Sequence, residues 1–485
     1  MKNSMARDAI RLTVARVITT AIGLLTMILL SHFRTLEEYG SFSQVQTVVN
    51  IFVSLFILGL PGSLSYFLVR NDGDRDRRVF LSNYLTLSTL ISLVLGAALF
   101  FSTPLIESYY GNDYLGALAF AFALLPWASI TFGGFDNFMV VYKRTHLLMI
   151  FKISYSTCLL LAILIAEWQQ LSFHDYMILY LLVQSAFSAV IYILVTRIAG
   201  HLRVSADRRL LQSVLAFSIP LGLATVVGTW NIELDKLIVG RLTNTESLAI
   251  YSNGSRELPV SLLTTAMTAV LLPRVVRDAK EFKFNEATDM WGTATIISYY
   301  VICFFSALCI VASPQVMTVL YSEKYLPGVP VFRVYSLVML MRTTYFGMIL
   351  NAVGKTKMIL LSSLIALTMN VTLSVPLFWV FGLIGPAIAS LVSIVSVGLL
   401  QLYLTGRITG ITFRALLPWR SLFRVSLVNV VMGVIVYSVL WSIHAGTDMA
   451  GIARTVGVCS LWVIVYALVM RKSFQAHWAR IDRIE

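Results

Sequence analysis

The stretch TWNIELDKLIVGRLTNTESLAIYSN, residues 229–253, continues the apolar run LAFSIPLGLATVVGTW at 215–230. A run of this length and composition is typical of a membrane-spanning helix, which needs about 20 mostly apolar residues. Glu233, Asp235 and Lys236 nevertheless fall inside it. Ionisable groups are costly within a membrane, so those that occur there are candidates for function by default. The stretch therefore predicts a membrane helix that carries charges for a reason.

The composition of the whole chain agrees with a membrane protein. Of its 485 residues, 58% are hydrophobic and 13% are charged, about half the charged share of a soluble domain. A folded soluble protein needs more polar cover than this. The aromatic content of 12% fits the use of Trp and Tyr at membrane interfaces.

The net charge of +13 does not indicate nucleic-acid binding. A nucleic-acid binder gathers its basic residues on one patch or helix, whereas here they are scattered singly through short loops. No P-loop motif is present, and no arrangement of Ser, His and Asp suggests nucleophilic catalysis. The four cysteines form no C-x-x-C pair and lie in apolar segments, at positions 158, 303, 309 and 459. We therefore expect a protein that is not an enzyme and that has no cofactor and no metal.

Apolar segments long enough to cross a membrane recur along the chain. We count about fourteen of them, centred near residues 22, 52, 91, 124, 159, 186, 225, 263, 303, 341, 365, 391, 434 and 463. The first is expected to be a retained span rather than a signal peptide, since Arg16 interrupts it and no small-residue cleavage site follows.

The distribution of basic residues predicts the orientation. With the N-terminus inside and the spans alternating, roughly 28 basic residues fall on the cytoplasmic side and roughly three outside, namely Arg34, Arg241 and Lys324. Such a bias follows the positive-inside rule. It predicts an even number of spans and a multi-pass protein with both termini in the cytoplasm.

The chain also shows an internal echo. LSHFRTLEEYGSFS at 30–43 matches VGRLTNTESLAIYS at 239–252, and YKRTHLLMIFKI at 142–153 matches VGKTKMILLSSL at 353–364. The offsets are nearly equal and cover about six spans, as in transporters whose two halves are related by an axis along the membrane normal. We therefore predict an all-α membrane protein with two six-helix lobes, at 1–200 and 216–410. A cytoplasmic interfacial helix at 201–215 is expected to link them, and 411–485 should add two helices and a cytoplasmic tail.

Several segments resemble one transporter family. FRTLEEYGSFSQ at 33–44 and LGLPGSLSYFL at 58–68 are similar to the first loop and second span of polysaccharide-export flippases. SIPLGLATVVGTWNIELDKLIVGRL at 218–242 is similar to their seventh span, and 321–337 and 381–393 are similar to later segments. The chain thus resembles Wzx-type flippases of the multidrug/oligosaccharidyl-lipid/polysaccharide exporter superfamily.

The resemblance implies a substrate and a direction. Such flippases move an undecaprenyl-diphosphate-linked oligosaccharide, for example an O-antigen or exopolysaccharide repeat unit, from the cytoplasmic to the periplasmic leaflet of the bacterial inner membrane. They are expected to work by alternating access through a cationic cavity, driven by a proton or sodium gradient or by the membrane potential. Membrane lipids, a polysaccharide polymerase and a chain-length regulator are the other implied partners.

Other readings stay open at this point. A lipid II flippase of the MurJ type has a similar plan. A small-molecule or drug antiporter should have twelve spans and a cavity lined by acids. A membrane enzyme of the same pathway should carry a large periplasmic loop, whereas the outside loops here are short.

Basic residues inside spans are the candidates for binding the diphosphate, because a guanidinium binds phosphate through two parallel hydrogen bonds. Arg342 is the first candidate, since it lies in mid-span with no headgroup in reach; Arg256, Arg16 and Arg333 follow. The alternatives are an ion pair for Arg342 or Arg256, and an interfacial position for Arg16 or Arg333. Nine residues at about 100° each place Arg333 and Arg342 on opposite faces of one helix.

Acidic residues inside spans are the candidates for ion coupling or gating. Glu233 and Lys236 are three residues apart, so they are expected to pair on one face of the helix, and Asp235 then lacks that partner. Asp136 is a topological candidate to pair with Arg342. A static salt bridge that stabilises the lobe is the alternative to a coupling role for these acids.

Overall fold

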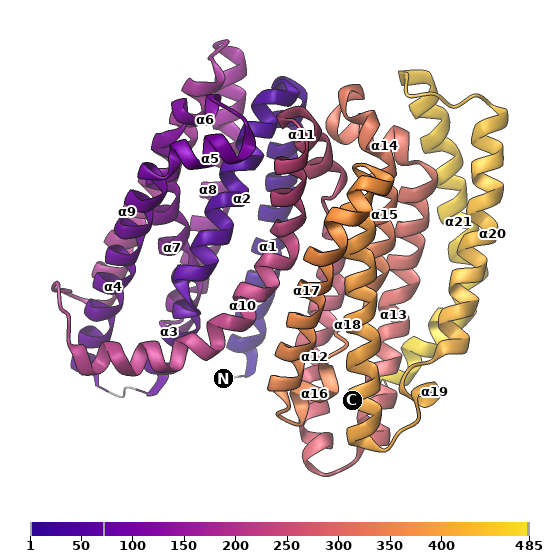
Figure 1. The fold of residues 1–485 in the computed structure, drawn as a ribbon. Coiled ribbons are helices and arrows are strands. Elements are labelled where there is room, and N and C mark those ends of the chain that lie inside the picture. The colour runs from indigo at the N-terminus through magenta and orange to yellow at the C-terminus, as the bar shows by residue number, and fades with distance from the viewer. Residues whose placement is uncertain (1, 71–72, 483–485) are drawn as a thin grey trace. The chain divides into compact units, whose positions relative to one another are not determined.

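The computed structural model describes residues 2–70 and 73–482, and every regular element in this part of the chain is a helix (Figure 1). Eleven of the described helices are long and apolar enough to cross a membrane. The number is 12 if the two segments of α10 (Arg208–Leu242), which are bent by 49°, count as one span. The prediction of an all-α multi-pass membrane protein is confirmed.

The chain divides into two compact units, Met1–Ala249 and Ile250–Glu485. Ahead of α10, the first unit contains α1 (Lys2–Phe33), α2 (Leu36–Ile57), α3 (Leu60–Arg70), α4 (Asp74–Phe101), α5 (Thr103–Tyr110), α6 (Tyr114–Ala117), α7 (Ala119–Val141), α8 (Thr145–Trp168) and α9 (Phe173–Ala199). The segment α11 (Thr245–Gly254) crosses the boundary along the chain.

The second unit contains the remaining helices. Its helices are α12 (Leu262–Lys280), α13 (Phe284–Val311), α14 (Ser313–Tyr321), α15 (Val329–Leu340), α16 (Met348–Ala352), α17 (Thr356–Phe381), α18 (Ile384–Thr409), α19 (Phe413–Leu416), α20 (Trp419–Ser442) and α21 (Met449–Asp482). Short 3-10 turns η1 (Pro259–Ser261), η2 (Glu323–Gly328) and η3 (Met341–Thr343) interrupt them.

Helix boundaries repeat along the chain in the register of the sequence echoes. The helix α8 begins at Thr145 and α17 begins at Thr356, 211 residues later. In the same way α9 begins at Phe173 and α18 at Ile384. These two helix starts therefore recur at the same offset in the two halves of the sequence, and the axis relating the halves stays a prediction.

The first of the echoed motifs is a helix start. Thr35 Oγ1 accepts the backbone N–H of Glu38 at 3.2 Å, and the Glu38 carboxylate accepts the N–H of Thr35 at 2.9 Å. This capping box satisfies two of the amides that a helix start leaves open. The FRTLEEYGSFSQ motif thus defines where α2 begins.

The segment at 201–215, for which an interfacial helix is predicted, has a different structure. Residues 201–207 are extended, and the helix begins only at Arg208, where the Asp207 carboxylate accepts the N–H groups of Arg209 and Leu210. Side chains of α4 supply the hydrogen bonds that a helix would otherwise provide. Asn83 accepts the N–H of Asp207 at 2.6 Å, and Ser82 and Thr86 accept those of Arg203 and Ser205.

The helix α10 packs within the first compact unit, against α2 and α3. The backbones come so close that a Cβ on Gly222 would lie 2.1 Å from the carbonyl carbon of Leu58. Only glycine fits such an approach. The boundary between the two compact units therefore lies between residues 249 and 250 of the chain. The division into two six-helix transport lobes, at 1–200 and 216–410, stays a prediction.

Two of the predicted spans are not continuous helices. The span centred near residue 263 is interrupted at 255–261, between α11 and α12, and the span centred near residue 341 is interrupted at 341–347, between α15 and α16. Non-helical backbone at membrane depth is tolerated where protein buries it or where it lines a wet cavity. These interruptions explain why neither segment is among the 11 uninterrupted spans.

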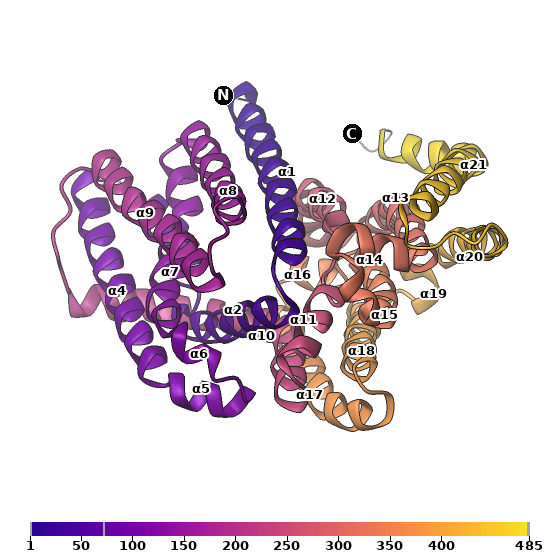
Figure 2. The same cartoon turned by 90° about the horizontal axis from the view of Figure 1, so that it is seen from above.

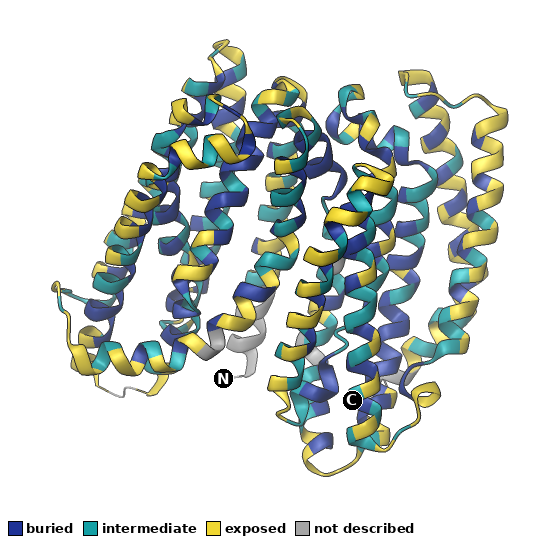
Figure 3. Ribbon diagram, in the orientation of Figure 1, coloured by how far each residue is buried: buried dark blue, intermediate teal, exposed yellow. Residues whose placement is uncertain are grey.

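The last two long helices pack on α13, as the view along the helices shows (Figure 2). Ile296, Tyr300 and Cys303 of α13 are buried in one cluster with Val425 of α20 and Trp462 of α21. The opposite sides of α20 and α21 are exposed and apolar, as Figure 3 shows. This burial pattern suits helices that face lipid on one side.

The Asn83 contacts give a first test of the fold. Replacing Asn83, which is 1% exposed, by Ala leaves the Asp207 N–H without its acceptor, a loss of about 1–3 kcal/mol. We expect the thermal midpoint of the purified protein in detergent to fall. Asn285→Ala, at an exposed position of α13, is the matched control and should leave the midpoint unchanged. Equal midpoints for the two variants would contradict the described role of Asn83.

Candidate functional site

The charged residues at membrane depth form two clusters, one in each compact unit. The first lies on α10 and α2 within Met1–Ala249, and the second lies at the two helix interruptions within Ile250–Glu485. Each cluster combines at least one acid with one base: Glu233 with Lys236 in the first, and Glu257 with Arg342 in the second.

The first cluster surrounds Glu233, which is 8% exposed. Lys236 Nζ lies 3.1 Å from Glu233 Oε2, so the pair predicted from the spacing along α10 is confirmed. Two side chains of α2 add hydrogen bonds to the same carboxylate: Asn50 Nδ2 donates to Oε1 at 3.0 Å and Thr47 Oγ1 donates to Oε2 at 3.4 Å. Glu233 therefore has three donors, of which the two on α2, Asn50 and Thr47, tie α10 to α2.

Asp235 is the most deeply buried acid of this cluster, with 1% of its surface exposed. Its carboxylate accepts the backbone N–H of Lys236 at 2.8 Å. The expectation that Glu233 and Lys236 leave Asp235 without a partner is therefore corrected. Burial of a carboxylate at membrane depth is unfavourable without such donors.

The second cluster is a two-pronged ion pair between Arg342 and Glu257. Arg342 Nε donates to both carboxylate oxygens, at 3.2 and 3.0 Å, and an Nη donates to Oε1 at 2.8 Å. The two side chains are 37% and 27% exposed, so water and small anions can approach them. The partner of Arg342 is thus Glu257, which is 85 positions away in sequence.

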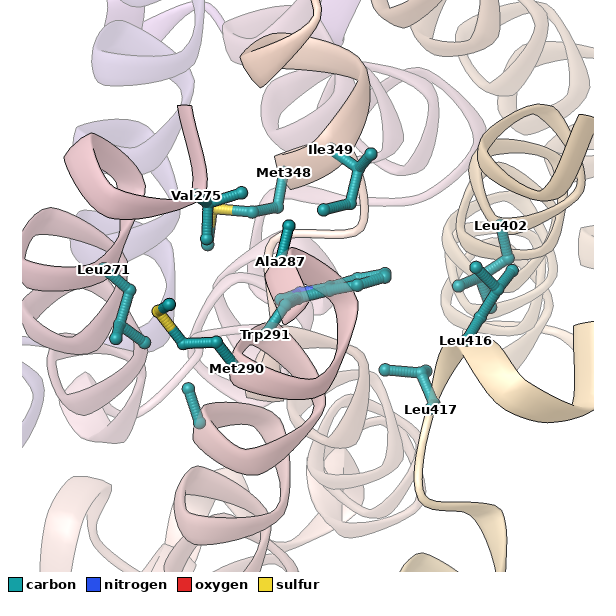
Figure 4. Close-up of a cluster of buried hydrophobic side chains, with 11 residues drawn as sticks. Leu271, Val275, Ala287, Met290, Trp291, Met348, Ile349, Leu402, Leu416 and Leu417 are labelled. Carbon is teal, nitrogen blue, oxygen red and sulfur yellow. The ribbon is translucent and has the colours of Figure 1, made fainter. Parts of the chain in front are cut away.

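Both partners of this pair come from interrupted helices. Glu257 lies in the segment 255–258, between α11 and η1, and Arg342 lies in η3, between α15 and α16. The α13 helix supports the second interruption, because Trp291 Nε1 and Thr295 Oγ1 donate to Thr344 Oγ1 at 2.7 and 2.8 Å. Trp291 is itself held in a buried apolar cluster (Figure 4).

The other predicted arginines have different surroundings. Arg256 is half-buried next to Glu257 in the same interruption, and its backbone N–H donates to Asn253 O at 3.3 Å. Arg333 donates from Nε to Ser313 Oγ at 2.7 Å, which anchors it to α14. Arg16 is exposed on α1, and within the described residues its side chain has no hydrogen bond or ion pair.

Asp136 does not pair with Arg342. It lies on α7 and forms an ion pair with Lys152 of α8, at 2.5 Å, within the first unit.

An exposed ion pair lies in the loop before α13. The Lys283 ammonium donates a hydrogen bond to Glu281 and lowers the pKa of that exposed carboxyl. Within the described residues, no group of three or more His, Cys, Asp or Glu side chains is placed to hold a metal ion.

Sequence reasoning missed the partners rather than the charges. Thr47 and Asn50 are three residues apart on α2. Two polar side chains on one face of an apolar helix indicate that a polar or charged group of another helix packs against them. Glu257 was visible as an intramembrane acid two residues before Pro259. Its contact with Arg342 joins two distant segments, which no local pattern can show.

Comparisons with known proteins agree with this architecture. Residues 5–278 match the family described as polysaccharide biosynthesis protein. The teichuronic acid biosynthesis protein TuaB of Bacillus subtilis (strain 168) is 23% identical over 285 residues. That match covers 57% of this chain and 56% of TuaB, so it spans about half the length of the curated relative.

Two solved structures share the fold. The lipid II flippase MurJ in an inward closed conformation has a TM-score of 0.73 at 15% identity, covering 95% of this chain and 98% of that chain. An inward-facing multidrug resistance transporter of the MATE family, in the MOP superfamily, has a TM-score of 0.63 at 16% identity, covering 83% and 99%. At these identities the likeness describes the fold.

The Glu233–Lys236 pair can be tested with a double-mutant cycle. Removing one member of a buried ion pair costs about 3–5 kcal/mol, whereas replacing both members is often neutral. We therefore expect Lys236→Met and Glu233→Gln each to lower the thermal midpoint, and the double variant to regain most of the loss. The same cycle on the exposed Glu281–Lys283 pair should change little. Additive losses at Glu233 and Lys236 would show that the two side chains do not depend on each other.

Proposed function

Because the chain belongs to the polysaccharide biosynthesis protein family, we propose that it is a flippase for a lipid-linked oligosaccharide in the bacterial cytoplasmic membrane. It moves an undecaprenyl-diphosphate-linked repeat unit from the cytoplasmic to the periplasmic leaflet, with both of its own termini in the cytoplasm. The fold shared with a lipid II flippase and with multidrug transporters supports transport rather than catalysis as the activity.

The substrate has three parts that make different demands on the protein. The polyprenyl tail is apolar and stays in lipid, while the diphosphate and the sugars must leave water. An unpaired charge in hydrocarbon is very unfavourable, so the protein must offer cationic, hydrogen-bonding partners along the route. A fixed arginine fork meets this demand better than lysine, because it binds two phosphate oxygens at once and stays charged.

The observation that carries the proposal is the two-pronged contact of Arg342 with Glu257. A carboxylate held by a guanidinium in this way occupies the geometry that two phosphate oxygens take in a bidentate complex. We infer that Glu257 occupies the position that the diphosphate takes on Arg342 during transport. The partial exposure of both side chains leaves the pair accessible to a competing anion.

Exchange between these two anions gives a route for the headgroup. The diphosphate displaces Glu257 from Arg342, and Glu257 returns when the headgroup leaves, so the arginine is never left without a partner. The exchange keeps each charge paired throughout, and a charge at reduced exposure to water is unfavourable when it loses its partner. Because both residues lie in helix interruptions, short loop segments rather than whole helices can move with them. Arg256, next to Glu257, supplies a second positive charge.

The remaining charged residues take supporting roles in the proposal. Arg16, exposed on α1, is assigned to the first encounter with the headgroup, and Arg333 holds α15 against α14. Glu233, Asp235 and Lys236 are the candidates for coupling to a proton or sodium ion, and Asp136 with Lys152 is a candidate gate. One charge that crosses 100 mV gains about 2.3 kcal/mol, which is enough to give the flip a direction.

The chemistry of the relatives supports a polysaccharide precursor as the cargo. TuaB is a teichuronic acid biosynthesis protein, and the matched family is one of polysaccharide biosynthesis. A drug antiporter needs no fork for phosphate. The polymerase and chain-length regulator expected from the resemblance are assigned as partners on the same grounds.

The proposal is tested in a deletion strain assayed for lipid-linked oligosaccharide in each leaflet. We expect the deletion to accumulate the lipid-linked sugar on the cytoplasmic side, and wild type to restore export. Arg342→Ala should reduce export at least tenfold, because it removes the fork that binds the diphosphate. Unchanged lipid-linked sugar in the deletion strain would rule out this cargo.

A double variant separates binding from stability. Arg342→Met with Glu257→Gln removes both charges of the pair, so its thermal midpoint should be close to that of wild type. If Arg342 binds substrate, export stays lost in this folded protein. If the pair only stabilises the fold, export returns. Arg333→Met, on α15, is the control for loss of a positive charge outside the Arg342–Glu257 pair, and it should keep most of the export.

A further inference from the structure

A polar pocket lies within the second unit at the junction between α13 and the last two helices. It has a volume of about 200 Å³. One wall is a face of α13, another is the loop between α19 and α20 with the first turn of α20, and His477 of α21 closes a third side. The pocket is separate from the Arg342–Glu257 pair, and none of the transport residues lines it.

A glycine creates the space for this pocket. Gly292 lies on the lining face of α13, and a Cβ there would meet Pro418 Cδ at 3.2 Å, with the carbonyl oxygen of Leu416 at 4.0 Å. The absence of a side chain therefore lets the loop before α20 approach α13 closely and leaves a hollow beside it. The nearby carbonyl oxygen of Leu416 is a potential ligand.

Oxygen atoms dominate the lining. Thr288, Asp289 and Thr293 contribute from α13 and Ser421 contributes from α20. Thr288 is 3% exposed, and its hydroxyl has no hydrogen-bond partner in the described part of the chain. Buried hydroxyls are normally satisfied, and one that is not calls for a water, an ion or a ligand. Asp289 lines the pocket as an exposed residue, and its carboxylate forms no hydrogen bond or ion pair with any described residue.

Two backbone donors beside the pocket are already used. The backbone N–H groups of Ser421 and Leu422 donate to the carbonyl of Pro418, at 2.9 and 3.0 Å. His477 Nδ1 lies 2.7 Å from Ser473 O and 3.3 Å from the Tyr300 hydroxyl, so these two contacts occupy this ring nitrogen and the other one has no partner among the described residues. What remains for an occupant is a carboxylate, hydroxyl oxygens, a carbonyl and an imidazole nitrogen.

We propose that this pocket binds a singly charged alkali cation, Na⁺ or K⁺, which links the loop before α20 and the end of α21 to α13. Hard cations prefer carboxylate, carbonyl and hydroxyl oxygens. The single carboxylate, Asp289, balances one positive charge. The volume of about 200 Å³ holds the ion with several waters, since each water takes about 30 Å³. The cation bound here stabilises the fold and is distinct from any ion that drives transport.

The test measures thermal midpoints of the full-length protein in detergent. Choline chloride is exchanged for NaCl or KCl at constant ionic strength, so that screening does not change. A cation that binds only the folded state raises the midpoint by mass action. We expect a rise of about 2–4 °C between 1 and 100 mM Na⁺ or K⁺. Hydrogen exchange at 413–421 should slow over the same range.

Two variants locate the effect. Asp289→Asn and Thr288→Val each remove an oxygen ligand and should abolish the cation-dependent rise. Glu286→Gln, in the first turn of the same helix and outside the pocket, should keep it. A rise that persists in Asp289→Asn, or no rise with either alkali ion, overturns the assignment. A rise produced only by Mg²⁺ or Ca²⁺ overturns it as well, because the site would then take a doubly charged ion.

Discussion

The structure depends on one constraint, which is that no charge or backbone polar group at membrane depth can be left without a partner. In water an unpaired Arg342 or Glu257 would be unremarkable, whereas in a low-dielectric environment each requires the other. At the interruption 341–347, the Thr344 side-chain hydroxyl accepts hydrogen bonds from Trp291 and Thr295 of α13, which hold this segment in place. The Arg342–Glu257 pair joins two helix interruptions, and such non-helical backbone is tolerated in a membrane where protein buries it or where it lines a wet cavity.

The two compact units meet this constraint in different ways. In Met1–Ala249 the acid and base lie on one continuous stretch of α10, and α2 adds neutral donors to Glu233. That arrangement is local and preorganised, which suits a fixed brace or a site that exchanges a small ion. In Ile250–Glu485 the pair joins two interruptions, so it can separate when short segments move. The second arrangement is the one suited to exchanging a bulky anion.

The internal repeat makes these differences informative. The helix boundaries recur at an almost constant offset, yet α7 is one continuous helix of 23 residues while its counterpart is divided into α15 and α16. A repeated sequence that departs from its own pattern at one place has a reason to do so, and such departures are expected at functional sites. The departure coincides with Arg342. The helices α20 and α21 have no counterpart in the first half. Ser421 of α20 and His477 of α21 line the pocket proposed to bind Na⁺ or K⁺.

The sequence by itself determined what depends on neighbours along the chain. Apolar length defined the membrane helices, the Thr35–Glu38 spacing defined the start of α2, and three-residue spacing paired Glu233 with Lys236. The tertiary structure alone decided the contacts between distant segments: Arg342 with Glu257, Asp136 with Lys152, and the extended segment at 201–207 with α4. The physical reason is that helix periodicity fixes only where a side chain lies on its own helix. Which helix meets that face is set by packing, and packing also decides where a helix must break.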